Sequence, residues 1–225
     1  MKKVLFLLFT LSMTCGMFAA DMVSPNAKLK VVAEGQGCKV YYQQQQVLDI
    51  PVLGNGSSQI MKVGKARHIT ADYQMLTGKR LHCTNEANEY QLTLGKDTRL
   101  VMRLYNDGVA FRYEGLSDKE KTAYKIPQGT KRWMQKWTDS YEGFFPQTTK
   151  ATDGRWGYPA LLEPADGVFV LLSEANICKG QAGSSLHSKG DLYQVVPDGN
   201  QPSAISHLPG VSPSSVLWLM WWSQR

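Results

Sequence analysis

The stretch Arg99-Leu-Val-Met-Arg-Leu-Tyr-Asn-Asp-Gly-Val-Ala-Phe-Arg-Tyr-Glu114 decides the fold class of this chain. Two side-chain sets alternate from Leu100 to Tyr105 and again from Val109 to Glu114, which is typical of strands with one buried face. Between these runs we expect Asp107 and Gly108 to take the positive φ values that a narrow turn needs. The stretch therefore predicts a hairpin in an antiparallel sheet.

Strand patterns continue on both sides of this hairpin. Turn residues recur every ten or so positions and no long amphipathic helix is visible, so the chain is expected to be an all-β sandwich. Residues 60–85 are less periodic and predict only one or two strands. The glutamines Gln43 to Gln46 are expected at a hairpin tip. The clearer strands are predicted at Leu29–Ala33, Lys39–Tyr42, Val47–Asp49, Tyr90–Leu94, Val168–Leu172 and Leu192–Val196.

Three segments carry more specific expectations about burial. The apolar run Val168–Leu172 is expected to be buried on both faces. The charged segment Ser117–Thr122 predicts a solvated loop. An aromatic cluster between two prolines is expected to belong to the core rather than to a sugar-stacking platform, because each ring buries a large apolar area. Its members are Trp133, Trp137, Tyr141, Phe144 and Phe145.

The first 20 residues have the layout of a secretory signal peptide. Lys2 and Lys3 precede the apolar run Val4–Leu11, and cleavage is expected after Ala20 or Ala19. The apolar run is too short to serve as a membrane span. Lipid attachment at Cys15 is a less favoured alternative, because small residues do not directly precede this cysteine. The sequence thus predicts export to the periplasm.

Charge and cysteine content narrow the function classes. The net charge of +6 is spread without a basic run, so a nucleic-acid partner is not expected. Cys38, Cys83 and Cys178 remain in the expected mature chain. An oxidising compartment would permit one disulfide, with the pairing left open, but buried free thiols are the favoured interpretation.

The usual catalytic and metal-binding motifs are absent from the sequence. The four histidines are far apart, so a zinc site is not expected, and neither a GxSxG nor a phosphate-binding GxxxxGK motif is present. No acidic pair has a spacing that marks a glycosidase acid and base. The histidines are His68, His82, His187 and His207.

Several segments, taken in order, resemble the N-terminal domain of glycoside hydrolase family 97, the calcium-dependent α-glucosidases and α-galactosidases of bacterial polysaccharide-utilisation systems. The matching segments are Ser24–Leu29, Leu104–Glu114, Ser140–Phe144, Trp156–Ala160 and Leu171–Ala175. The resemblance implies an antiparallel super β-sandwich of the galactose-mutarotase type over residues 21–210.

The end of the chain departs from this family pattern. Family members continue with a Pro-Trp-Arg-Val motif and a catalytic barrel, whereas residues 211–225 form an aberrant tail that contains Trp218, Trp221 and Trp222. We therefore expect a domain truncated before the barrel, with a sandwich that is incomplete at its C-terminal end, and we hypothesise a frameshift or premature stop near Pro209 to Pro213.

The resemblance also assigns site residues. Glu174 corresponds to a glutamate that reaches the barrel's active site as a calcium ligand, and Trp156 and Tyr158 belong to a loop at the sugar-binding cleft. Since Ca²⁺ requires six to eight oxygen ligands, Glu174 alone is not expected to hold it. The alternative for Glu174 is a solvated glutamate at a strand end, and the alternative for the loop of Trp156 and Tyr158 is a packed loop without a binding role. The catalytic carboxylates belong to the barrel, so no catalytic residue is expected here.

These expectations favour a non-catalytic carbohydrate-binding and scaffold module of a family 97 glycoside hydrolase, inactive alone. Its partners would be an α-linked oligosaccharide and the catalytic barrel, with Ca²⁺ present only in the intact enzyme. Two alternatives stay open. One is a free-standing periplasmic carbohydrate-binding protein that uses Trp156 and Tyr158. The other is a nonfunctional remnant with exposed sheet edges.

Overall fold

The structure is a computed structural model that describes residues 19–78, 80–116, 120–140, 142–175, 183–197, 216–217 and 220–223. Most of the expected signal peptide, with Cys15, lies outside the described residues, as do Tyr141, Cys178 and His207. Within the described ranges every regular element is a β-strand and all strand pairs are antiparallel, which confirms the all-β expectation. Among these residues, no helix has the length and apolarity needed to cross a membrane.

The largest sheet has eight strands in the order β1-β2-β3-β4-β10-β18-β17-β13. Its N-terminal half is a meander of β1 to β4, which confirms the strands predicted up to residue 49. The cleavage site expected after Ala20 or Ala19 lies inside β1. The strands are β1 (Ala19–Val23), β2 (Leu29–Glu34), β3 (Gly37–Tyr42), β4 (Gln45–Val52), β10 (Ala123–Lys125), β13 (Gly154–Trp156), β17 (Ser184–Lys189) and β18 (Leu192–Pro197).

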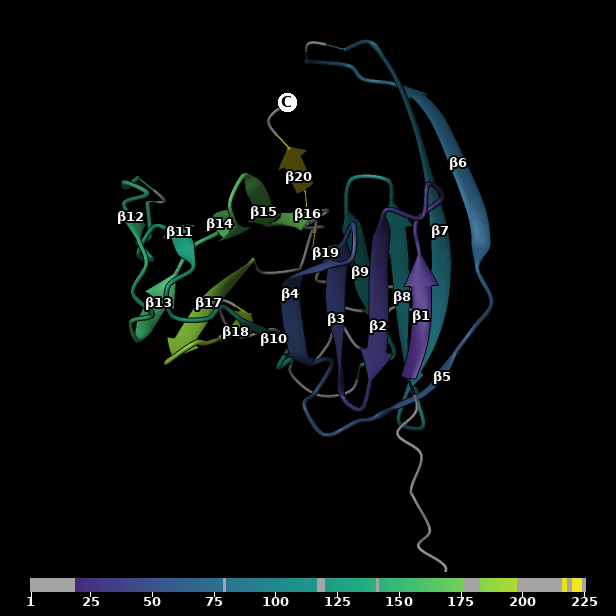
Figure 1. Cartoon of the computed structure of the whole chain (residues 1–225), viewed down its shortest axis with the longest axis horizontal. Coiled ribbons are helices and arrows are strands. Elements are labelled where there is room, and N and C mark those ends of the chain that lie inside the picture. Colours follow the sequence, from purple (N-terminus) through teal and green to yellow (C-terminus); the bar gives the residue numbers. More distant parts are fainter. Residues whose placement is uncertain are drawn as a thin grey trace, which may run out of the picture.

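A five-stranded sheet contains the organising hairpin and packs against the meander; Figure 1 shows β7, β8 and β9 behind β1 to β4. The hairpin consists of β8 (Thr98–Tyr105) and β9 (Val109–Glu114), as predicted. The less periodic region 60–85 contains β5 (Ile60–Val63), β6 (Arg67–Gln74) and the first part of β7 (His82–Leu94). The long N-terminal extension of β7 was not predicted.

The hairpin turn differs from the expectation in one respect. Neither Asp107 nor Gly108 has a positive φ. Tyr105 donates its backbone N–H to the carbonyl of Gly108 at 2.8 Å, so the loop contains only Asn106 and Asp107, and it closes in an ordinary conformation. The prediction of positive φ was wrong because short loops of this kind also accept turns with negative φ. Positive φ values occur instead at Gln43 and Gln44, which supports the predicted hairpin tip there.

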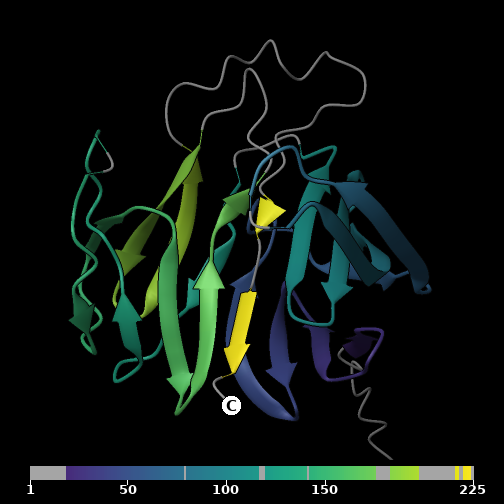
Figure 2. The ribbon, with the colours of Figure 1, turned by 90° about the horizontal axis from the view of Figure 1, so that it is seen from above.

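A second five-stranded sheet has the order β12-β11-β14-β15-β20. Figure 2 shows β14 and β15 extended by β20, drawn in yellow. Part of the aberrant tail therefore contributes strands, because β20 pairs with β15 and β19 pairs with β16. The strands are β11 (Lys131–Trp133), β12 (Gln147–Thr148), β14 (Ala160–Ala165), β15 (Val168–Leu172), β16 (Glu174–Ala175), β19 (Val216–Leu217) and β20 (Met220–Ser223).

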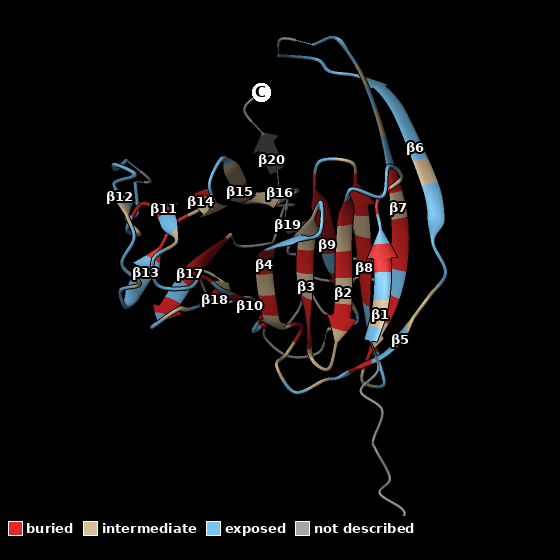
Figure 3. Ribbon diagram, viewed as in Figure 1, coloured by how far each residue is buried: buried red, intermediate tan, exposed pale blue. Residues whose placement is uncertain are grey.

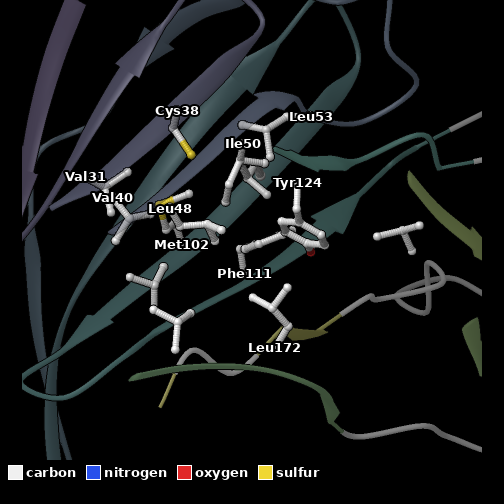
Figure 4. Packing of buried hydrophobic residues seen from close by; sticks show 14 of the residues in the cluster. Val31, Cys38, Val40, Leu48, Ile50, Leu53, Met102, Phe111, Tyr124 and Leu172 are labelled. Atoms are coloured by element: carbon white, nitrogen blue, oxygen red, sulfur yellow. The ribbon is translucent and has the colours of Figure 1, made fainter. Parts of the chain in front are cut away.

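One continuous core joins the three large sheets. Figure 4 shows side chains of the meander, among them Val40 and Ile50, facing Met102 and Phe111 of the hairpin, with Leu172 of β15 nearby. Cys38 lies in this core as a buried free thiol, as predicted, and the free thiol of Cys83 is half-buried. Burial of this amount of apolar surface is the main term that stabilises such a sandwich.

Two burial predictions were wrong. In β15 only Val170 and Leu172 are buried, and the other three residues are half-buried, so the strand is not buried on both faces. In the aromatic cluster the side chains of Phe144 and Phe145 are 92% and 41% exposed. These two rings lie between β11 and β12, outside the named strands. Trp133 and Trp137 are half-buried.

Candidate functional site

Ser184 bonds both carboxylate oxygens of Glu174. Glu174 opens β16, directly after β15, and its side chain is half-buried. Ser184, the buried first residue of β17, donates its backbone N–H to Glu174 Oε2 at 2.9 Å and its hydroxyl to Oε1. Because both carboxylate oxygens accept bonds from one residue, the direction of the carboxylate is fixed by the packing of β17.

Tyr158 lies close to the same carboxylate and to Ser184. Its hydroxyl is near the hydroxyls of Ser184 and Tyr124. Burial raises the pKa of Tyr158 well above its ordinary value, and the negative charges of Glu174 and Glu120 raise it further. Burial likewise raises the pKa of Tyr124. Both phenols therefore stay protonated at neutral pH and act as neutral hydrogen-bonding groups. We call Glu174, Ser184, Tyr158 and Tyr124 the Glu174 cluster.

A second carboxylate, that of Glu120, lies near the Glu174 cluster and was not predicted from the sequence. Glu120 is only 7% exposed and accepts a hydrogen bond from Thr122 Oγ1 at 2.7 Å. Thr122 in turn lies 2.7 Å from the hydroxyl of Tyr113, which accepts the N–H of Gly54 at 2.9 Å. Of the segment Ser117–Thr122, which was expected to be a solvated loop, residues 117–119 lie outside the described residues; Lys121 is exposed as expected, but Glu120 and Thr122 are buried. The only signal in the sequence is that Thr122 and Tyr124 alternate into the start of β10.

The Glu174 cluster does not form a complete metal site or an acid–base pair by itself. Among the described residues, no group of three or more histidine, cysteine, aspartate or glutamate side chains could hold a metal ion. Ca²⁺ needs six to eight oxygen ligands, so these residues do not fit a self-contained calcium site. Glu120 is buried and bonded to Thr122, which does not suit a group that must reach a glycosidic bond.

Trp156 is not part of the Glu174 cluster. It ends β13, its side chain is 7% exposed, and its Nε1 donates to Ser188 Oγ at 2.8 Å. Such a ring has no open face for a sugar, so its placement favours the packed-loop alternative. The preceding Arg155 lies over the ring of Trp137, with its guanidinium carbon 3.8 Å from the centroid. Of the three predicted site residues, the structure thus brings together Tyr158 and Glu174.

A surface pocket of about 470 Å³ lies elsewhere, between the loop before β11 and the β14–β15 hairpin. Its rim carries the ion pair of Lys131 Nζ and Glu163 Oε2 at 2.9 Å. None of the predicted site residues lines it. Its lining is formed by residues 127–131 and 163–166.

Comparison with known proteins gives one family and one set of structures. The family model described as "Glycosyl-hydrolase 97 N-terminal" matches residues 22–211. No curated protein matches the chain. The similar solved structures include family 97 glycoside hydrolases from Pseudoalteromonas sp. strain K8. An arginine-to-lysine variant has a TM-score of 0.68 at 17% identity, and a complex with acarbose has 0.68 at 18%.

A third similar structure from the same strain, a glutamate-to-glutamine variant in complex with panose, has a TM-score of 0.65 at 17% identity. Each of the three alignments covers 90% of this chain and 34% of the enzyme. The chain therefore spans about a third of the length of these enzymes. At this identity the likeness establishes the fold, and the described sandwich is the part that corresponds.

Proposed function

Because this chain belongs to the glycosyl-hydrolase 97 N-terminal family, we propose that it is a non-catalytic scaffold and carbohydrate-binding module of a family 97 glycoside hydrolase. In this proposal it is inactive alone. It acts together with a catalytic barrel on α-linked oligosaccharides, and it is exported to the periplasm. Two of the similar enzymes were solved in complex with acarbose and panose, which supports an oligosaccharide as the substrate class.

The observation that carries the proposal is the fixed carboxylate of Glu174. A scaffold contributes to a site on another domain by presenting a ligand in a defined direction, and Ser184 provides that direction from a buried strand. The Glu174 carboxylate would supply one ligand to a Ca²⁺ ion in the intact enzyme, with most ligands supplied by the barrel. Tyr158 would support this geometry through Ser184 rather than contact the sugar itself.

The proposal is tested first on the chain alone. We expect the purified chain to release no chromophore from aryl α-glucosides or α-galactosides, with or without added Ca²⁺. A hydrolysis rate that rises with chain concentration and survives repurification would overturn the non-catalytic assignment.

The second arm adds the catalytic portion of a family 97 enzyme that lacks its own N-terminal domain. We expect a calcium-dependent gain of activity with the wild-type chain and a loss of that gain with Glu174→Gln. The matched control is Glu163→Gln, which removes a carboxylate from the distant pocket rim. Equal effects of the two substitutions would contradict a role for Glu174.

One observation favours a second candidate, a free-standing carbohydrate-binding protein. The ring of Phe144 is 92% exposed, and an exposed aromatic ring can stack on a sugar. This candidate predicts glycan binding by calorimetry that is lost in Phe144→Ala and kept in Trp156→Phe. Unchanged binding in Phe144→Ala would exclude this platform.

A further inference from the structure

The β6–β7 arm, residues 67–89, extends from the sandwich as a long two-stranded hairpin. Figure 1 shows it curving past the ends of the neighbouring strands, and Figure 3 shows that β6 is mostly exposed. Within the described part of the chain β6 pairs only with β7, so its other edge carries unpaired backbone groups. Such an edge is a template for pairing with another strand.

The backbone of β6 shows which residues face the open edge. Met75 donates its N–H to the carbonyl of Leu81 at 2.8 Å, in line with the register that pairs Gln74 with His82. In an antiparallel ladder, alternate residues direct both backbone groups to the same neighbour. Odd-numbered residues of β6 therefore bond to β7. His68, Thr70 and Asp72 direct their N–H and C=O groups outward.

The two faces of the arm have different chemistry. One face is largely apolar and exposed toward the tip, where Tyr73 and Met75 are each 43% exposed and Leu81 is 61% exposed. The other face carries His68, Thr70 and Asp72, with the partners Glu86, Thr84 and Asn88 on β7. A strand paired at the open edge would have to continue both an apolar and a polar surface.

A second copy of β6 meets this requirement. When two copies pair antiparallel with Thr70 opposite Thr70 of the second copy, residues on the same face oppose each other. Asp72 then lies opposite His68, Ile69 opposite Ala71, and Arg67 opposite Tyr73, in each case twice by symmetry. Apolar pairs and threonine pairs are favourable cross-strand combinations, and the Asp72 carboxylate can accept a hydrogen bond from the His68 imidazole.

The charges of β6 agree with this register. His68 lies 3.8 Å from Glu86 within its own chain, whereas Asp72 has no ion-pair partner among the described residues. The strand contains no proline, which would otherwise block edge pairing. Charged residues on an edge usually prevent association. Here Asp72 and His68 face each other as acceptor and donor when the strand meets itself, and the contact is isologous as a two-fold axis requires.

We propose that the open edge of β6 binds a second copy of this chain, forming a two-fold dimer in which the two five-stranded sheets continue into one. The axis passes beside Thr70. The outward backbone groups of His68, Thr70 and Asp72 and of their counterparts form about six hydrogen bonds. This contact does not depend on the proposed enzymatic role.

The test measures the association state of the full purified chain by sedimentation velocity over a concentration series. We expect a reversible dimer with a dissociation constant on the order of 10 µM, as for a small interface. Asp72→Lys places a cation opposite His68 and should weaken association about tenfold. Thr84→Lys is the matched control, because Thr84 lies beside Asp72 on the same polar face but belongs to β7; it should leave the dimer intact.

A cross-link gives a second, independent readout. Thr70→Cys should form an intermolecular disulfide under mild oxidation, because hydrogen-bonded residues lie about 5.5 Å apart between Cα atoms, within disulfide range. Thr84→Cys should not. A chain that stays monomeric up to about 1 mM, equal weakening by the two lysine substitutions, or the absence of the Thr70→Cys cross-link would each overturn the proposal.

Discussion

Replacing the buried Glu89 with glutamine should measurably destabilise the five-stranded sheet of β5 to β9 at neutral pH. Glu89 lies on β7 with a side chain only 4% exposed. Its Oε1 accepts a bond from Arg67 Nη2 at 2.5 Å, and its Oε2 accepts one from Arg103 Nε at 2.8 Å. The carboxylate thus joins β6 and β8 across β7. Glutamine keeps the shape but loses the charge and turns a donor toward one arginine.

The size of the effect follows from the exposure of the partners. A hydrogen bond to a charged group contributes about 1.5–3 kcal/mol. Arg67 and Arg103 are 69% and 39% exposed, so water screens them and can replace part of the lost interaction. We therefore expect a loss of about 2 kcal/mol in the free energy of unfolding. For a chain of this size the melting temperature should fall by about 4–8 °C.

The pH dependence has a definite sign. Burial raises the pKa of Glu89, but the hydrogen bonds from Arg103 and Arg67 outweigh burial and hold the pKa below its ordinary value of 4.5. A carboxyl whose pKa is lower in the folded chain stabilises the fold above pH 4.5. That contribution disappears as the pH falls through the folded-state pKa. The difference between wild type and variant should be constant near neutrality and shrink below pH 4.5.

Chemical denaturation followed by circular dichroism at several pH values measures this difference. Glu114→Gln is the matched control, since Glu114 also bridges two arginines, Arg99 and Arg112, on the same sheet but is 36% exposed. Its loss should stay below about 0.5 kcal/mol. Equal stability of Glu89→Gln and wild type at pH 7, or a difference that grows as the pH falls, would refute the reasoning.

Three further predictions concern single buried positions. Trp156→Ala removes a 7% exposed ring and its bond to Ser188, so it should cost about 3–5 kcal/mol in denaturation experiments, and Trp156→Phe should cost clearly less. Burial and the charge of Asp49 raise the pKa of Cys38 to about 12, so Cys38 should resist thiol reagents at pH 8 until the chain is unfolded; rapid native labelling of Cys38, mapped by mass spectrometry, would contradict its placement. Gly37→Ala would bring a Cβ within 2.2 Å of the Ile50 carbonyl oxygen and should lower stability by about 3 kcal/mol. The control Gly167→Ala, where the added Cβ meets no atom within 4 Å, should cost about 1 kcal/mol. Similar melting curves for the two variants would count against the close approach of β3 and β4.

The sequence predicted strands well where side-chain alternation was regular. The hairpin of β8 and β9 is confirmed by its register, although Val101 and Tyr105 on the second face of β8 are buried as well. The aromatic cluster failed because ring density does not say which way a ring points. Phe144 lies outside the named strands and is 92% exposed.

The candidate site was less predictable than the fold. Glu120 stands between Lys119 and Lys121 in the sequence, a composition typical of solvent-exposed loops, whereas in the structure it is buried and bonded to Thr122. The link from Glu174 through Ser184 to Tyr158 depends on which strands become neighbours. Local pattern carries no information on that register, so the two predicted residues could be named but not connected.

The strand β10, only Ala123–Lys125, lies between β4 and β18 and is the sole connection in the described sheet between its N-terminal and C-terminal halves. A nascent chain cannot complete that sheet when the first four strands have been made, because the bridging strand is synthesised much later and its other neighbour later still. Assembly must therefore wait for contacts between distant segments, which slows folding in topologies of this kind. Until then β4 offers an unpaired edge, and that interval is when the growing polypeptide most needs protection from self-association.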